Sequence, residues 1–144
     1  MKSMVSENVR NITRYRNARL SSGTLELKAN NVLKFVPKNN IEITANHIYE
    51  FKQVTKNSNL NKYGLLVCLS SPFSYTENAV NILSKDQQLQ ALAIILKNQE
   101  KNLKNALFME MASILPNPFQ IPVKIFKDEN CGHEYISRIL DKKN

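Results

Sequence analysis

The stretch that decides the fold class is residues 120–140, which read QIPVKIFKDENCGHEYISRIL. Val123, Ile125 and Phe126 suit a buried strand. The carboxylate of Asp128 can then accept hydrogen bonds from the unpaired N–H groups of a helix that begins directly after it. Apolar residues follow at the spacing of one helix face, at Tyr135, Ile136, Ile139 and Leu140. The stretch therefore predicts a strand joined to a capped helix.

The same alternation of strand and helix is predicted upstream. Residues 24–29 and 32–36 alternate polar and apolar side chains, and Asn30-Asn31 between them tolerates the positive φ values of a tight turn. This pattern predicts a β-hairpin, which Pro37 ends because proline cannot donate to a strand ladder.

Five further elements follow the hairpin. Thr44 is expected to cap a helix over 45–57, with Ile48, Phe51 and Val54 or Thr55 on its inner face. A buried strand is then predicted at 63–69, followed by a short helix that a Ser74-x-x-Glu77 capping box opens. A strand is predicted at 89–96, although its composition also allows a helix, and an amphipathic helix is predicted over 103–115.

The order is thus β-β-α-β-α-β-α-β-α, which indicates the α/β class. We expect a single domain over residues 20–144, with a mostly parallel five-stranded sheet, an antiparallel N-terminal hairpin strand, and helices packed on the sheet. Residues 1–19 are expected to form a basic, partly disordered leader, since five of them are lysine or arginine and one is acidic.

Composition indicates a globular protein without a membrane span. Of the 144 residues, 42% are hydrophobic and 22% are charged, and no apolar run approaches the ~20 residues that cross a bilayer. The first residues lack the apolar core of a secretory signal, so we expect a cytoplasmic location. Half of the net charge of +8 lies in the leader and the rest is spread over the chain, and Tyr15 is the sole aromatic residue of the leader, so a nucleic-acid partner is the less favoured interpretation.

The sequence predicts no catalytic residue, metal site or cofactor. It contains no glycine-rich phosphate loop, Cys-x-x-Cys or His-Glu-x-x-His pattern. Cys68 lies in an apolar run and is expected to pack as a small hydrophobic residue. Cys131 lies on the first turn of the last helix, where the helix N-terminus lowers a thiol pKa in some proteins, but no basic partner is evident. His47 and His133 are the two histidines, and neither has the second ligand that a zinc helix needs.

Two surfaces are candidates for contact. The first is the loop after the strand at 63–69, because ligands and partners bind at the carboxyl ends of strands in open α/β sheets. Its hydroxyl residues also have ordinary capping roles, whereas its aromatic residues are typical interface anchors. The candidate interaction loop comprises Ser70, Ser71, Phe73, Ser74, Tyr75, Thr76 and Glu77.

The second surface is an apolar patch at the 103–115 helix, formed by Phe108, Met109, Met111 and Phe119. These residues suit a core, but an outward-facing Met109 beside Phe119 would make a dimer patch or the mouth of an apolar pocket. A homodimer is also compatible with the exposed edge of the hairpin.

The chain resembles the anti-sigma-factor-antagonist-like (STAS-like) bacterial domains over residues 24–140. The resemblance rests on the segments LLVCL at 65–69, ALAII at 91–95 and PVKIFKDENCGHEYI at 122–136. It implies a non-catalytic binding module. In the regulatory branch a serine in the loop after the third strand is phosphorylated by an anti-sigma kinase. Here Thr76, Glu77 and Asn78 occupy that region, and Cys68 stands where an aspartate is common, so the chain departs from the switch pattern.

The function hypothesis is therefore a regulatory or scaffolding domain that binds an unidentified protein partner without the phospho-serine switch. The alternative is a binder of a lipid or another small apolar molecule, suggested by the Met-rich 103–115 segment and by the lipid-transfer-like members of the family. A third class, nucleic-acid binding by the basic leader, would require steep salt dependence.

Overall fold

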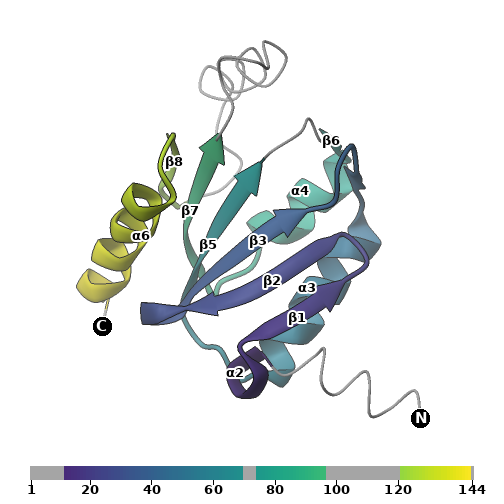
Figure 1. Cartoon of the computed structure of the whole chain (residues 1–144). Helices are drawn as coiled ribbons and strands as arrows, with labels where there is room; N and C mark the ends of the chain where they lie inside the picture. The colour runs from purple at the N-terminus through teal and green to yellow at the C-terminus, as the bar shows by residue number, and fades with distance from the viewer. Residues whose placement is uncertain (1–11, 70–73, 97–120, 144) are drawn as a thin grey trace.

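The computed structural model describes residues 12–69, 74–96 and 121–143, whose core is a six-stranded mixed sheet (Figure 1). The strand order is β1-β2-β3-β5-β7-β8. The first three strands are joined antiparallel, and β3, β5, β7 and β8 run parallel. The strands are β1 (Asn17–Leu20), β2 (Gly23–Lys28), β3 (Val32–Pro37), β5 (Tyr63–Leu69), β7 (Leu89–Leu96) and β8 (Val123–Phe126).

The remaining elements are helices and one separate pair of short strands. Strands β4 and β6 form a two-stranded parallel sheet apart from the main one. Their bounds, with those of the helices, are α2 (Ile12–Tyr15), the 3-10 turn η1 (Ala29–Asn31), β4 (Glu42–Ile43), α3 (Ala45–Asn57), β6 (Ser74–Tyr75), α4 (Glu77–Ser84) and α6 (Glu129–Lys143).

The α/β class is confirmed, but the predicted order and the count of five strands are wrong. The main sheet gains β1, whose first three residues lie within the stretch assigned to the leader. Helix α2 precedes it and is anchored, because Ile12 N–H donates to Ser58 Oγ at 2.8 Å and Thr13 Oγ1 donates to Ser58 O at 2.6 Å. Ile12 is fully buried. The ordered fold therefore begins before residue 20, whereas residues 1–11 lie outside the described part.

The predicted hairpin is confirmed as strands β2 and β3, paired antiparallel from Gly23↔Pro37 to Lys28↔Val32. Asn30 and Asn31 have φ values of 64° and 59°, the left-handed region that asparagine tolerates. Three residues connect the strands, one more than the two-residue turn expected, because Ala29 joins the two asparagines in η1.

The predicted helices at 45–57 and after Asp128 are confirmed. The buried face of α3 consists of Ile48, Phe51, Val54 and Thr55, as its spacing predicted. Helix α6 begins at Glu129, where Asp128 Oδ1 accepts from the N–H of Asn130 at 3.1 Å. The predicted helix over 103–115 lies outside the described residues.

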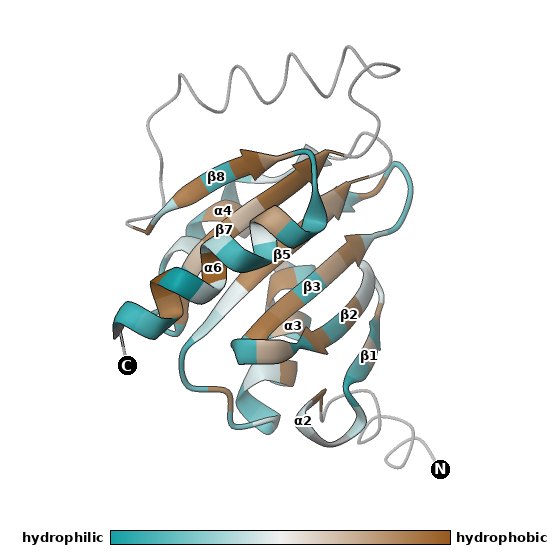
Figure 2. Cartoon of the chain, turned by 60° about the vertical axis from the view of Figure 1, so that its left-hand side comes forward, coloured by the Kyte–Doolittle hydropathy of each residue, from teal (hydrophilic) through white to brown (hydrophobic). Residues whose placement is uncertain are grey.

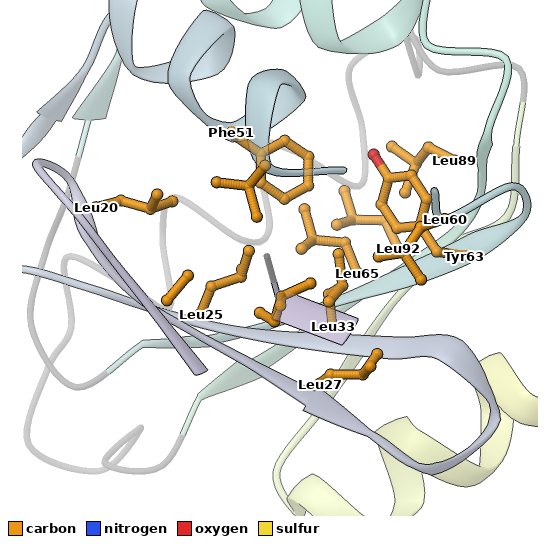
Figure 3. Close-up of a cluster of buried hydrophobic side chains, with 13 residues drawn as sticks. Leu20, Leu25, Leu27, Leu33, Phe51, Leu60, Tyr63, Leu65, Leu89 and Leu92 are labelled. Carbon is orange, nitrogen blue, oxygen red and sulfur yellow. The ribbon is translucent and has the colours of Figure 1, made fainter. Parts of the chain in front are cut away.

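The helices cover both faces of the sheet. On one face, Phe51 and Val54 of α3 pack with Leu25, Leu33 and Leu65 in the larger core cluster (Figure 3). On the other face, α6 packs on the alternate residues of β5 and β7, through Ile136, Leu140, Leu66, Ala91, Ala93 and Ile95. The central strands are apolar on both faces for this reason, and Figure 2 shows them mostly in brown.

Candidate interaction site

The described part of the predicted interaction loop forms an ordered corner, here named the β6–α4 corner and defined as residues 74–77. Strand β6 pairs in parallel with β4, in the register Glu42↔Ser74 and Ile43↔Tyr75. The N–H of Ser74 donates to Ile41 O at 3.1 Å, and the N–H of Thr76 donates to Ile43 O at 2.9 Å. The backbone of the corner is therefore held on both sides of Tyr75.

Helix α4 begins two residues later than the predicted Ser74 capping box requires, so that prediction is wrong. Thr76, not Ser74, is the N-cap, because its Oγ1 accepts from the N–H of Ala79 at 3.2 Å. Ser74 is unsuited to the cap position because its backbone already belongs to β6. Glu77 occupies the first helical turn, where its negative charge interacts favourably with the positive end of the helix dipole.

A small apolar cluster supports the corner from below. Ile43, Ile48 and Ala79 are buried together, and side chains of α4 pack against them. Tyr75 lies outside this cluster and is 42% exposed. A large aromatic side chain on a fixed backbone loses little conformational entropy on binding, so it is suited to anchor a contact. The predicted residues Ser70, Ser71 and Phe73 lie outside the described part of the chain.

The start of helix α3 lies beside the corner, because β4 leads directly into it. The N–H of Thr44 donates to His47 Nδ1 at 3.0 Å, and the two residues form a capping box. Helices α3 and α4 contact each other. The capped N-termini of α3 and α4 thus both lie next to the β4–β6 pair that carries the exposed Tyr75.

A second group of polar side chains, which the sequence reasoning missed, meets where α6 crosses the sheet. Lys34 Nζ lies 3.0 Å from Glu129 Oε1, and both side chains are largely buried, at 20% and 23% exposure. Cys68 is buried beneath them, with its Sγ 3.9 Å from the same carboxylate oxygen. The hydrogen bond that Lys34 donates to Glu129 raises the pKa of Lys34, against the lowering effect of burial. The sequence did contain a signal for this pair. Lys34 is two residues after Val32, so both side chains lie on the face of β3 that helix α6 covers, where a lysine needs a partner.

The cysteine on the first turn of α6 does not have the electrostatics of a nucleophile. Cys131 is exposed, and its Sγ lies 3.5 Å from Asp128 Oδ2. This hydrogen bond to a carboxylate raises the pKa of the thiol, which opposes the lowering that a helix N-terminus can cause. His133, two residues later, is directed elsewhere, with its Nε2 3.0 Å from Ala29 O in the hairpin turn.

Within residues 12–69, 74–96 and 121–143, no three His, Cys, Asp or Glu side chains are grouped so that they could hold a metal ion. No helix in the same ranges combines the length and apolar character needed to cross a membrane. The predicted apolar patch of Phe108, Met109, Met111 and Phe119 lies outside the described residues.

Comparisons with known proteins add no relative. The sequence matches no protein-family model, and no curated protein or solved structure matches the chain. The corner and the fold that supports it are therefore interpreted on their geometry.

Proposed function

We propose that the chain is a non-catalytic regulatory or scaffolding domain that binds a protein partner through the β6–α4 corner. The observation that carries the proposal is the exposure of Tyr75 on a backbone fixed by hydrogen bonds to Ile41 and Ile43. The ionisable groups described above support the non-catalytic part of the proposal, because they have structural roles. Lys34 and Glu129 pair with each other, and Asp128 caps a helix.

The proposed domain resembles the STAS-like regulatory modules but acts without their phosphorylation switch. The hydroxyl oxygen of Thr76 already accepts the capping hydrogen bond of α4. The partner is therefore expected to recognise the unmodified corner.

Site-specific cross-linking tests the proposal. A photoreactive benzoylphenylalanine at position 75 is expected to give a discrete adduct with one protein in cells that express the chain. The control carries the same group at Gln87, an exposed residue of the turn that precedes β7. Parallel strands bring this turn to the opposite rim of the sheet.

The adduct from position 75, without a counterpart from position 87, would support the proposal and identify the partner. An adduct of twice the chain mass would identify a second copy as that partner. Equal adducts from both positions, or none from either, would contradict it. With the partner in hand, Tyr75→Ala is expected to weaken binding by about 1–3 kcal/mol, the range of an aromatic hot spot.

A further inference from the structure

We propose that the outer edge of strand β1 is a docking site for an extended acidic segment of a partner protein, which adds to the sheet as a further strand. This inference goes beyond the function proposed for the β6–α4 corner and does not depend on it, because the two sites share no residue. It rests on the backbone of the edge and on the charges around it.

The backbone groups at this edge are directed outward. The N–H of Leu27 donates to Arg16 O at 2.8 Å, so residue 16 occupies a hydrogen-bonded position opposite β2. Hydrogen-bonded and non-hydrogen-bonded positions alternate in an antiparallel pair, so Ala18 and Leu20 also face β2. The N–H and C=O groups of Asn17 and Arg19 therefore point away from the sheet. Among the described residues, no backbone hydrogen bond reaches these four groups.

The open part of the edge is short and has defined ends. At its start, the N–H of Arg16 donates to Ile12 O at 2.8 Å. At its far end, Ser21 donates to Glu50 Oε1 from its N–H at 3.0 Å and from its hydroxyl at 2.7 Å. An added strand would thus pair with the outward groups of Asn17 and Arg19. So few backbone hydrogen bonds give weak affinity alone, and the side chains must contribute.

The side chains along this edge favour an acidic strand. Arg16 and Arg19 are exposed, and among the described residues neither forms an ion pair. The nearby carboxylates are engaged, since Glu26 pairs with Lys28 at 3.4 Å and Glu50 binds the backbone after β1. A carboxylate on an added strand would meet these guanidinium groups. A second copy of β1 is disfavoured, because it would bring the same arginines together.

Binding of designed peptides to the full chain tests the inference. The probe is an acetylated and amidated peptide of about seven residues that alternates glutamate and valine, and the matched control alternates lysine and valine. Amide hydrogen exchange, measured residue by residue by NMR, is the readout. The acidic peptide is expected to slow exchange at Asn17 and Arg19 by about tenfold at saturation, whereas the basic peptide leaves both unchanged.

Two variants separate the charge from the backbone contribution. Arg19→Gln removes the charge and keeps the N–H, so it is expected to weaken the acidic peptide by about threefold. Arg19→Pro also removes the outward donor, at a position where an edge strand tolerates proline, and is expected to weaken it by at least about tenfold. Lys85→Gln, which removes an exposed positive charge after α4, controls for net charge and should leave binding unchanged.

The outcomes are decisive in both directions. Protection confined to the β1 edge, with preference for the acidic peptide and the stated order of variants, would support the site. Equal binding of both peptides, protection elsewhere, or an unaffected Arg19→Pro variant would overturn it. So would the absence of any protection up to millimolar peptide. If Arg19→Pro fails to fold, the comparison of Arg19→Gln with Lys85→Gln still decides.

Discussion

Replacing Gly64 by alanine is expected to destabilise the protein by about 1–3 kcal/mol, because a methyl group has no room beneath helix α6. A Cβ at this position would lie 2.0 Å from Ile136 Cγ2 and 3.3 Å from Ile136 Cβ. Carbon atoms pack at about 3.5–4.0 Å, so relief requires a movement of about 1.5 Å. Ile136 is fully buried, and its β-branched side chain has one strongly preferred χ1 rotamer in a helix. The helix itself must therefore shift.

Guanidinium unfolding followed by far-UV circular dichroism measures the effect, since the chain has no tryptophan for fluorescence. The matched control is Gly132→Ala, whose Cβ would meet Ile95 Cδ1 at 2.7 Å and Leu66 Cδ1 at 2.8 Å. These atoms end flexible side chains and can move. Alanine also gains up to about 1 kcal/mol over glycine within a helix. The control is therefore expected to change stability by less than about 1 kcal/mol.

A double-mutant cycle identifies the contact. In an Ile136→Ala background the clashing methyl group is absent, so Gly64→Ala is expected to cost nothing or to recover part of the stability lost to the cavity. The coupling energy should be about 1–3 kcal/mol. A Gly64→Ala variant within about 0.5 kcal/mol of wild type, or one equally destabilised in both backgrounds, would refute the packing of β5 against α6.

Three further predictions concern polar contacts. The folded pKa of Lys34 is raised, so its ion pair stabilises the wild type below about pH 10.5 and this stabilisation is lost as the pH rises further. Lys34→Met should therefore lose less stability than the wild type over the same rise in pH. Unfolding at pH 9 and pH 11 would measure this. Tyr63 donates to Asp86 at 2.7 Å from a fully buried site, and its pKa is raised well above 10.0. Its phenol should stay un-ionised in ultraviolet titration until the protein unfolds, and Tyr63→Phe should cost about 1–3 kcal/mol. Thr76→Ala should cost about 1 kcal/mol in thermal unfolding and Ser74→Ala much less, whereas the reverse order would restore Ser74 as the cap.

Periodicity and capping chemistry were sufficient to predict the central elements. The apolar runs at 63–69, 89–96 and 123–126 are strands with those bounds, side by side in the sheet. Each is an apolar run of four to eight residues bounded by polar or turn residues, and its length and its place in the alternation favour a strand over a helix. Helix α3 was equally predictable, because Thr44 and the spacing of its inward residues agree.

The elements that escaped prediction are short or depend on distant partners. Strand β1 has four residues, and its inward side chains are Ala18 and Leu20, too few to show a period among arginines. Helix α2 is ordered by Ser58, which lies 46 residues away from Ile12 in the sequence. Strand β6 has two residues and depends on pairing with β4. Local patterns carry no information about such pairings, so tertiary contact decided them.

The candidate site was predicted in part for the same reason. The position after β5 follows from the rule that contacts gather at the carboxyl ends of parallel strands. The choice of Thr76 over Ser74 as the cap does not follow, because both are good N-cap residues and the register of β6 decides between them. The pairing of Lys34 with Glu129 needs the position of α6 over β3, which the strand pattern alone does not give.

The sheet itself separates the two proposed contact regions from its packed centre. Strands β5 and β7 are apolar on both faces, because α3 lies on one side and α6 on the other. In β2, by contrast, Leu25 and Leu27 face the core while Thr24, Glu26 and Lys28 occupy the opposite face. This alternation is typical of a sheet with one solvated side. A partner that contacts the polar strands or the rim of the sheet therefore need not disturb the packing of the centre, and we expect Tyr75→Ala and Arg19→Gln to leave that packing intact.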